Sequence, residues 1–187
     1  MGKDYALLEL NEVRRRDRAV EDEEWIQTML HRAPTGTLAT VFEGQPFINS
    51  NLFVYDEAAH VIYIHTAQVG RTRANLEADE RVCFSIHQMG RLLPADTALE
   101  FSVEYAGVTV FGRGTTLTDS HQASFALQLL LDKYAPQLRP GQHYQPITAA
   151  ELARTAVYQI TIEKWSGKRK QADPDFPGAF VYTLEVS

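Results

Sequence analysis

The stretch IYIHTAQVGRTRANL, residues 62–76, joins a strand pattern to a helix pattern. Its first half is β-branched and aromatic, which is typical of a strand, and this strand ends at His65 and Thr66. Gly70 then opens a short segment with helical spacing. The turn brings backbone N–H groups, the Thr66 hydroxyl and the Arg71 guanidinium to a helix N-terminus, where a phosphate is favoured. The alternative is a solvated helix face that carries Arg71 and Arg73.

The composition of the chain indicates a globular protein without affinity for polyanions. Of its 187 residues, 44% are hydrophobic and 22% are charged, so we expect one domain over residues 1–187 with a sizeable core. The 18 Lys and Arg residues against 24 Asp and Glu residues give a formal net charge of -6. This charge argues against nucleic acid and membranes as partners, so an anion site has to be built locally.

The expected location is the cytoplasm. The N-terminal segment lacks the apolar core of a signal peptide, and no run approaches the roughly 18 apolar residues of a membrane span. The single cysteine, Cys83, cannot form an internal disulfide, and its strand-like surroundings are typical of a buried thiol.

The other patterns predict a mainly β fold with flanking helices. Short β-branched and aromatic runs predict strands at 36–42, 46–55, 60–66 and 81–88, and the short gaps between them require mostly antiparallel neighbours. The run 99–117 predicts two more strands that bend or bulge at Gly107, Gly112 or Gly114, and 157–163 predicts another. Six or seven such strands favour a small closed or nearly closed barrel.

Apolar spacing predicts the helices outside this barrel. One runs from Asp22 to Pro34, a second is capped by Asp119 or Ser120 and ends before Pro136, and a third covers 148–156. The tail, residues 172–187, is expected to form one extra strand or an arm on a neighbouring subunit.

A second basic segment, KWSGKRK at residues 164–170, holds four of the 18 basic residues. An indole beside cations can border a flat ring while the cations neutralise a phosphate at its other end, so Trp165 and Lys168 are candidate ligand-binding residues. A basic surface turn with a half-buried Trp165 is the alternative.

Motifs for metal or hydrolytic chemistry are missing from the sequence. The six histidines show no metal-binding spacing, and there is neither a nucleophile elbow nor a phosphate-binding loop of the P-loop type. We therefore expect no metal, and we regard a hydrolase or a nucleoside triphosphatase as unfavoured.

The order of three segments, residues 14–56, 61–86 and 104–119, resembles the pyridoxamine phosphate oxidase-like family of FMN-binding split barrels. Within that family the chain is most similar to the nitroimidazole-resistance group. The resemblance covers most of residues 14–168. Its most specific part is the spacing of Tyr63, His65, Ala67, Gly70, Arg71 and Asn75.

The resemblance implies a homodimer with FMN in clefts at the subunit interface. The strand matching Phe47 to Asn51 would follow the pyrimidine edge of the flavin, and the turn after His65 would hold its phosphate. His65 is also the expected catalytic residue, which would orient or protonate a substrate; the alternative for His65 is a structural hydrogen bond. Together with the basic segment, the predicted cofactor-binding set is Ile48, Asn49, Ser50, His65, Thr66, Gly70, Arg71, Thr72, Asn75, Trp165 and Lys168.

The chain departs from the family at three positions. The family often has Lys at the position of Thr72, Pro near Ser50 and Ser at Gly107. Positive charge for the phosphate would then have to come from Arg71, Arg73 or the Lys168 cluster.

The expected activity is that of a cytoplasmic FMN-dependent oxidoreductase. It would use NADH or NADPH as a donor and reduce a small, flat, electron-poor compound such as a nitroaromatic or a quinone. Oxidation of pyridoxamine phosphate is less favoured, because the C-terminal segment lacks a second phosphate-binding pattern. The rival is a protein without catalytic activity that stores flavin or binds haem through His65, His87 or His121.

Overall fold

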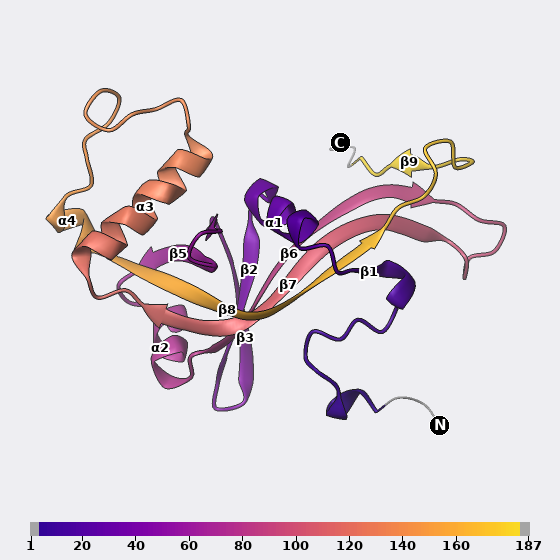
Figure 1. The fold of residues 1–187 in the computed structure, drawn as a ribbon, viewed down its shortest axis with the longest axis horizontal. Coiled ribbons are helices and arrows are strands. Elements are labelled where there is room, and N and C mark those ends of the chain that lie inside the picture. Colours follow the sequence, from indigo (N-terminus) through magenta and orange to yellow (C-terminus); the bar gives the residue numbers. More distant parts are fainter. Residues whose placement is uncertain (1–3, 184–187) are drawn as a thin grey trace.

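The computed structural model describes residues 4–183, which contain one antiparallel sheet with helices around it (Figure 1). None of the helices in this range is long and apolar enough to cross a membrane. The strands are β1 (Ala19–Val20), β2 (Gly36–Phe42), β3 (Gln45–Asn51), β4 (Val54–Asp56), β5 (Val61–Ala67), β6 (Arg81–Leu93), β7 (Ser102–Thr116), β8 (Thr155–Lys170) and β9 (Phe180–Val181). The helices are η1 (Tyr5–Leu7), η2 (Arg16–Arg18), α1 (Glu23–Arg32), α2 (Arg71–Ala78), α3 (Ser120–Tyr134) and α4 (Ala149–Leu152).

The sheet confirms the predicted antiparallel architecture. Its order is β3-β2-β6-β7-β8-β5-β4, with β1 added to β8 and β9 added to β6. β2 and β3 pair without interruption from Gly36 and Asn51 to Phe42 and Gln45. The turn between them uses positive φ angles at Glu43 and Gly44, as a tight hairpin requires. Because β3 lies at one end of the order, one of its edges is free of other strands in the described part of the chain.

The prediction of two strands in 99–117 is wrong, because β7 is a single strand. The predicted irregularity is a register shift at Phe111 and Gly112, where β8 has one residue more than β7. A Cβ atom on Gly112 would lie 2.0 Å from the Thr161 carbonyl oxygen. The glycine therefore permits a close approach of two backbones and does not end the strand.

Three other strand predictions have wrong ends. The predicted strand 81–88 continues to Leu93 as β6. The predicted strand 46–55 is divided into β3 and β4, because the Phe53 N–H leaves the sheet and donates to the Tyr134 hydroxyl at 3.0 Å. The predicted strand 157–163 continues through the basic segment to Lys170 as β8, so residues 164–170 are not a turn. Within a strand, successive side chains point to opposite faces, and this separates the members of the basic segment.

The predicted helix starts are confirmed by their caps. The Asp22 carboxylate accepts from the Trp25 N–H at the start of α1, and the Asp119 carboxylate accepts from the Gln122 N–H at the start of α3. Such caps are worth about 1 kcal/mol each. The helix predicted over 148–156 ends at Leu152, because β8 begins at Thr155.

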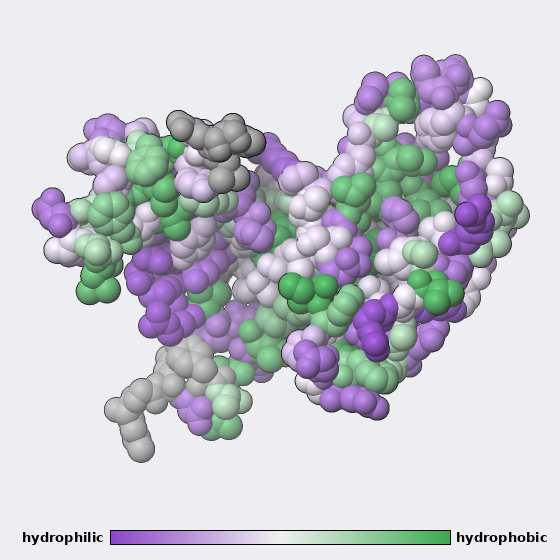
Figure 2. All heavy atoms as spheres, turned by 180° about the vertical axis from the view of Figure 1, so that it is seen from behind, coloured by the Kyte–Doolittle hydropathy of each residue, from purple (hydrophilic) through white to green (hydrophobic). Residues whose placement is uncertain are grey.

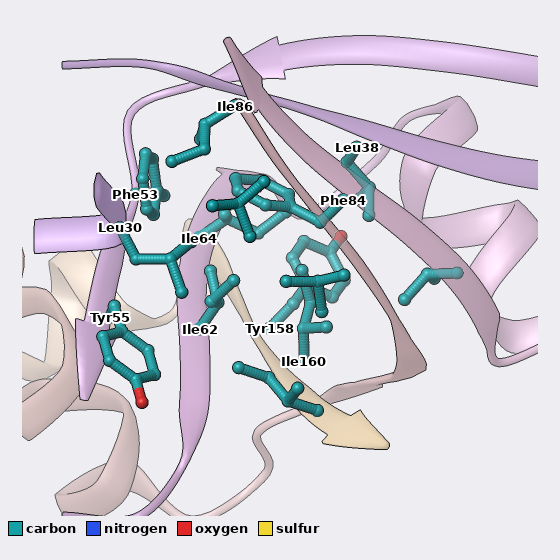
Figure 3. Packing of buried hydrophobic residues seen from close by; sticks show 14 of the residues in the cluster. Leu30, Leu38, Phe53, Tyr55, Ile62, Ile64, Phe84, Ile86, Tyr158 and Ile160 are labelled. Atoms are coloured by element: carbon teal, nitrogen blue, oxygen red, sulfur yellow. The ribbon is translucent and has the colours of Figure 1, made fainter. Parts of the chain in front are cut away.

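The core lies on both faces of β5. Ile62 and Ile64 point into the main cluster, where they meet Leu30 of α1, Phe84 and Tyr158 (Figure 3). The alternate residues of β5 belong to a second cluster beneath α3, which is made of Val54, Val61, Tyr63, Ala123, Ala126, Leu130 and Val157. The two-residue period of a strand thus assigns each side chain of β5 to one of the two clusters.

The ends of β6, β7 and β8 extend beyond the barrel, and with residues 171–182 we call them the arm (Figure 1). Seen from behind, the arm forms one side of the molecule, opposite the lobe that contains α3 and α4 (Figure 2). The Arg91 guanidinium pairs with the Glu104 carboxylate at 2.8 Å and also donates to the Pro174 carbonyl oxygen. The extra strand expected in the tail is present as β9, which pairs with β6, and the last residues of the tail lie outside the described range.

Candidate functional site

The predicted anion site lies where β5 is followed by α2. Gly70 precedes the helix without a side-chain cap, and the first turn contains no acidic residue. Arg71 is exposed, lies 5.7 Å from the centre of the Phe42 ring, and has no carboxylate partner among residues 4–183. Free N–H groups and an unpaired cation at a helix start are the features that favour an anion.

Arg73 does not share this freedom. Its Nε donates to the Glu77 carboxylate at 2.8 Å, and its Nη1 donates to the Gln68 carbonyl oxygen at 3.1 Å and to the Gln68 side chain. The Gln68 amide in turn donates to the Thr155 carbonyl oxygen at 2.9 Å. Arg73 therefore fastens the β5–α2 turn to β8, and Arg71 is the cation that this turn leaves available.

Three predicted residues, Asn49, Thr72 and Asn75, lie where α2 packs against the β2–β3 hairpin. The Asn49 amide donates to the Thr72 hydroxyl at 3.4 Å, and Thr72 is 5% exposed. The Asn75 amide donates to the Thr40 hydroxyl at 2.9 Å. Asn75 is fully buried, and its Oδ1 has no hydrogen-bond partner among the described residues. A buried acceptor without a partner is rare, and it marks this cluster as a place for a donor from water or a ligand.

Ile48 and Ser50 lie on the other face of β3 from Asn49. The burial of β3 alternates, with Asn49 partly covered and its two neighbours exposed. Ser50 lies 3.4 Å from the Thr37 hydroxyl on β2, and Ile48 is 68% exposed, which is high for a hydrophobic side chain. Asn49 therefore faces the barrel, whereas Ile48 and Ser50 form a short exposed face. The backbone of all three residues lies in the edge strand of the sheet.

His65 and Thr66 point to opposite faces of β5. Thr66 lies on the core side, where its hydroxyl is 3.1 Å from the Tyr158 hydroxyl. His65 follows Val61 and Tyr63 on the side that α3 covers. Its side chain is exposed, yet the protein around it removes enough water to lower the pKa of the imidazole. Desolvation therefore favours the neutral imidazole of His65, which can donate or accept a hydrogen bond.

A hollow of about 350 Å³ lies on the outer face of the sheet, across β6, β7 and β8. His87, Gly107 and Lys168 form one cross-strand row in it, and Ser85, Thr109 and Ser166 form the next row of this face. The Lys168 Nζ lies 5.4 Å from the centre of the Tyr105 ring. The outer hollow thus combines small uncharged residues with one lysine and one histidine.

The basic segment does not reach the anion site of its own chain. Lys168 is eleven residues along β8 from Val157, the partner of His65, which is about 36 Å at 3.3 Å per residue. Trp165 packs against the core, and its ring centre lies 4.7 Å from that of His60. The prediction that both residues border the same ring as His65 therefore requires a second chain for Lys168, and the structure gives Trp165 a packing role.

Sequence reasoning missed Gln68, Tyr158 and the row that joins His87 to Gly107. The sequence contained a signal for this row. Alternate residues of a strand share one face, so His87 was expected on the same face as Cys83 and Ser85. The role of Gln68 depends on contacts across strands, which the sequence does not reveal. Within the described range, no group of His, Cys, Asp and Glu side chains is placed to hold a metal ion.

Residues 22–169 match the sequence model of a family described as pyridoxamine 5'-phosphate oxidase. Among curated proteins, no sequence matches the chain significantly.

Three solved structures illustrate the similarity in fold. The flavocytochrome Anf3 from Azotobacter vinelandii has a TM-score of 0.76 at 23% identity, with 93% of this chain and 85% of that chain covered. The FAD and haem binding protein from Mycobacterium smegmatis has a TM-score of 0.72 at 23% identity, with 84% and 76% covered. A candidate 5-nitroimidazole antibiotic resistance protein from Bacteroides thetaiotaomicron has a TM-score of 0.68 at 16% identity, with 81% and 86% covered. At these identities the comparison establishes the fold alone.

Proposed function

The chain belongs to the pyridoxamine 5'-phosphate oxidase family, and from this premise we propose that it is a cytoplasmic FMN-dependent oxidoreductase that works as a homodimer. The observation that carries the proposal is the β5–α2 turn, where Arg71 lacks a carboxylate partner within the described range and the first turn of α2 has no acidic residue. The unpartnered Oδ1 of Asn75 behind this turn adds a second feature that suits a ligand.

The phosphate of FMN would be held by the N-terminus of α2 and by Arg71. Backbone N–H groups at a helix start and a guanidinium provide charge-assisted hydrogen bonds to phosphate oxygens. The position where the family often has Lys is Thr72, whose side chain is buried against Asn49. Arg71 therefore has to supply the positive charge from this side of the phosphate.

The outer hollow of a second copy would supply the other side of the site. Its row of His87, Gly107 and Lys168 adds a lysine to the anion site and a glycine surface on which a flat ring can rest. In this arrangement Lys168 of one copy and Arg71 of the other would serve the same phosphate, although the two residues lie far apart in one chain. The free edge of β3, at Ile48 to Ser50, would meet the pyrimidine side of the ring through backbone groups.

The flavin supplies the electron transfer when it is bound, and the protein supplies position, hydrogen bonds and exclusion of water. His65 is the residue that we propose for the substrate. Because desolvation lowers its pKa, a neutral imidazole can hold a hydrogen bond to a polar group of the substrate and exchange a proton with it. NADH or NADPH is the proposed donor, and a small nitroaromatic or quinone-like compound is the proposed acceptor.

A second candidate function is binding of haem or another planar ligand without turnover. Among His65, His87 and His121, His87 lines a hollow, and that hollow also contains Lys168, which could meet a carboxylate. Two of the similar folds are named as a flavocytochrome and as an FAD and haem binding protein.

An absorption spectrum of the purified protein, with mass spectrometry of the released small molecule, separates the two candidates. A flavin spectrum that bleaches with NADH or NADPH and returns with a nitroaromatic or a quinone supports the oxidoreductase. A haem spectrum that the His87→Ala substitution abolishes supports the second candidate. Protein that takes up neither compound refutes both.

A further inference from the structure

We propose that the groove between α1 and the arm is a second ligand site, which binds a flat aromatic anion independently of the flavin. This groove has a volume of about 460 Å³. Sites for small organic ligands commonly measure roughly 300 to 1,000 Å³. Its lining combines Trp25, Thr28, Met29 and Arg32 of α1 with residues of β6, β7 and β8.

The groove and the outer hollow lie mainly on opposite faces of the same strands, and they share a rim made of His87, Gln88, Met89, Tyr105 and Ala106. Gln88, Ala106 and Arg169 form one cross-strand row, and Arg169 reaches Trp25 of α1. The neighbouring row, which holds His87, Gly107 and Lys168, therefore points away from α1. Trp25, Arg32 and Arg169 line the groove and not the outer hollow, so a ligand held by these three residues would not occupy the outer hollow.

Trp25 gives the groove a rigid flat surface. Its ring packs against β8 so closely that a Cβ atom on Gly167 would lie 3.1 Å from it, and Trp25 also contacts the main core. The Arg169 guanidinium lies 5.7 Å from the centre of the Trp25 ring. An indole and a guanidinium in one wall can both stack on an aromatic ligand.

The charge of the groove is positive although the protein is acidic. Neither Arg32 nor Arg169 has a carboxylate partner among residues 4–183. The one carboxylate that lines the groove, Glu104, is already paired with Arg91 and also accepts from the Ala172 N–H. The carbonyl groups at the C-terminal end of α1 would repel an anion. One of them, the Leu30 carbonyl oxygen, accepts from the Lys133 ammonium, which offsets part of this repulsion.

These features fit an aromatic ring that carries one phosphate or carboxylate. The ring would stack on Trp25, its anionic group would meet Arg169 and Arg32, and Thr28 and Gln88 would offer hydrogen bonds. A nucleoside monophosphate and an aromatic carboxylic acid share this chemistry. AMP and 1-naphthoate represent the two sources.

The test is a titration of ¹⁵N-labelled full-length protein, followed through the indole N–H signals of its two tryptophans. Either AMP or 1-naphthoate should shift the Trp25 signal with saturation and leave the Trp165 signal in place; the Trp165→Phe variant assigns the two signals. Which compound binds identifies the source of the ligand. Adenosine, which has the ring without the charge, should bind at least about tenfold more weakly than AMP.

Matched substitutions locate the anionic group. Arg169→Gln and Arg32→Gln should each weaken the binding of the active compound by about tenfold, the scale of one charge-assisted hydrogen bond. Arg154→Gln removes the same charge from an exposed position outside the groove and should have no effect. Arg71→Gln should not change the binding of AMP, and Arg169→Gln should not change that of FMN, so failure of the flavin proposal would leave this result intact.

Two results would overturn the second site. One is the absence of a saturable Trp25 shift with both compounds at millimolar concentration. The other is a shift of the same affinity in the Arg32→Gln, Arg169→Gln double variant, or with adenosine in place of AMP.

Discussion

The substitution Arg71→Ala tests the proposed phosphate site, and the contacts of Arg71 in the structure set the expected changes in stability and in FMN affinity. Arg71 makes no ion pair within the described range, so its removal breaks no salt bridge there. Its contact in the free protein is the Phe42 ring at 5.7 Å, and an exposed cation–π contact is worth at most about 1 kcal/mol. The fold of the variant should therefore be nearly as stable as that of the parent.

The cost to FMN binding should be larger. A charge-assisted hydrogen bond contributes about 1.5 to 3 kcal/mol, and the exposure of Arg71 lowers the bottom of this range to about 1 kcal/mol. The dissociation constant of FMN should rise by about 5- to 150-fold. Titration of the apoprotein with FMN, followed by quenching of flavin fluorescence, measures this change, and added salt should reduce the difference between parent and variant.

Arg73→Ala is the matched control, because it removes the same charge two positions further along α2. The Arg73 guanidinium is held by Glu77 and Gln68 and fastens the β5–α2 turn, so its loss should lower the free energy of unfolding more than the loss of Arg71 does and should weaken FMN binding less. Unchanged affinity in Arg71→Ala would refute the assignment of Arg71. Equal losses in both variants would show that the net charge of the turn matters and that no guanidinium contacts the phosphate.

Three further predictions follow from the other ionisable groups. His65→Ala should reduce turnover more than FMN retention, and equal losses of turnover and retention would make His65 a structural residue. An NMR titration of the parent should place the pKa of His65 below 6.5. The pairing with Arg91 lowers the pKa of Glu104 to about 2, so docking of residues 171–182 should be complete above pH 4.5 and should fail as the pH falls towards 2. Glu104→Gln should speed amide exchange in residues 171–182 at neutral pH. Unchanged exchange would contradict this role of Glu104. Burial lowers the pKa of Lys133 from 10.5 to about 8, so between these pH values the unfolded chain binds more protons than the folded chain. The free energy of unfolding, measured by urea titration, should therefore rise with pH between 8 and 10.5. Lys133→Met should abolish this rise, and a rise that persists in the variant would refute its assignment to Lys133.

The local signals in the sequence predicted the elements well where a cap or a period of two decides the structure. Asp22 and Asp119 cap the helices that their spacing predicted, and the alternation in 61–67 places Ile62 and Ile64 in the core. The family resemblance predicted a split barrel, and the antiparallel sheet and the similar solved folds agree with it.

Strand lengths were not predictable from local patterns. Gly112 looks like a bend in the sequence, yet the partner strand accommodates it with one extra residue, and only the pairing of β7 with β8 reveals this. The Phe53 N–H leaves the sheet because Tyr134, far away in the sequence, accepts its hydrogen bond. Such choices depend on contacts across the fold.

The candidate site was predictable as a set of residues but not as an arrangement. Arg71 and Arg73 are equivalent in the sequence, and only the contacts of Gln68 and Glu77 distinguish them. Trp165 and Lys168 are close in the sequence, but the alternation of β8 turns one to the core and the other to the outer hollow.

A crystal structure of the protein grown with excess FMN tests the central claim most directly. We predict phosphate density at the N-terminus of α2 within hydrogen-bond distance of Arg71, with the ring between the β3 edge of one copy and the outer hollow of a second. The account is contradicted if the β5–α2 turn is free of phosphate while FMN is bound elsewhere, or if the outer hollow faces solvent in a protein that has bound FMN.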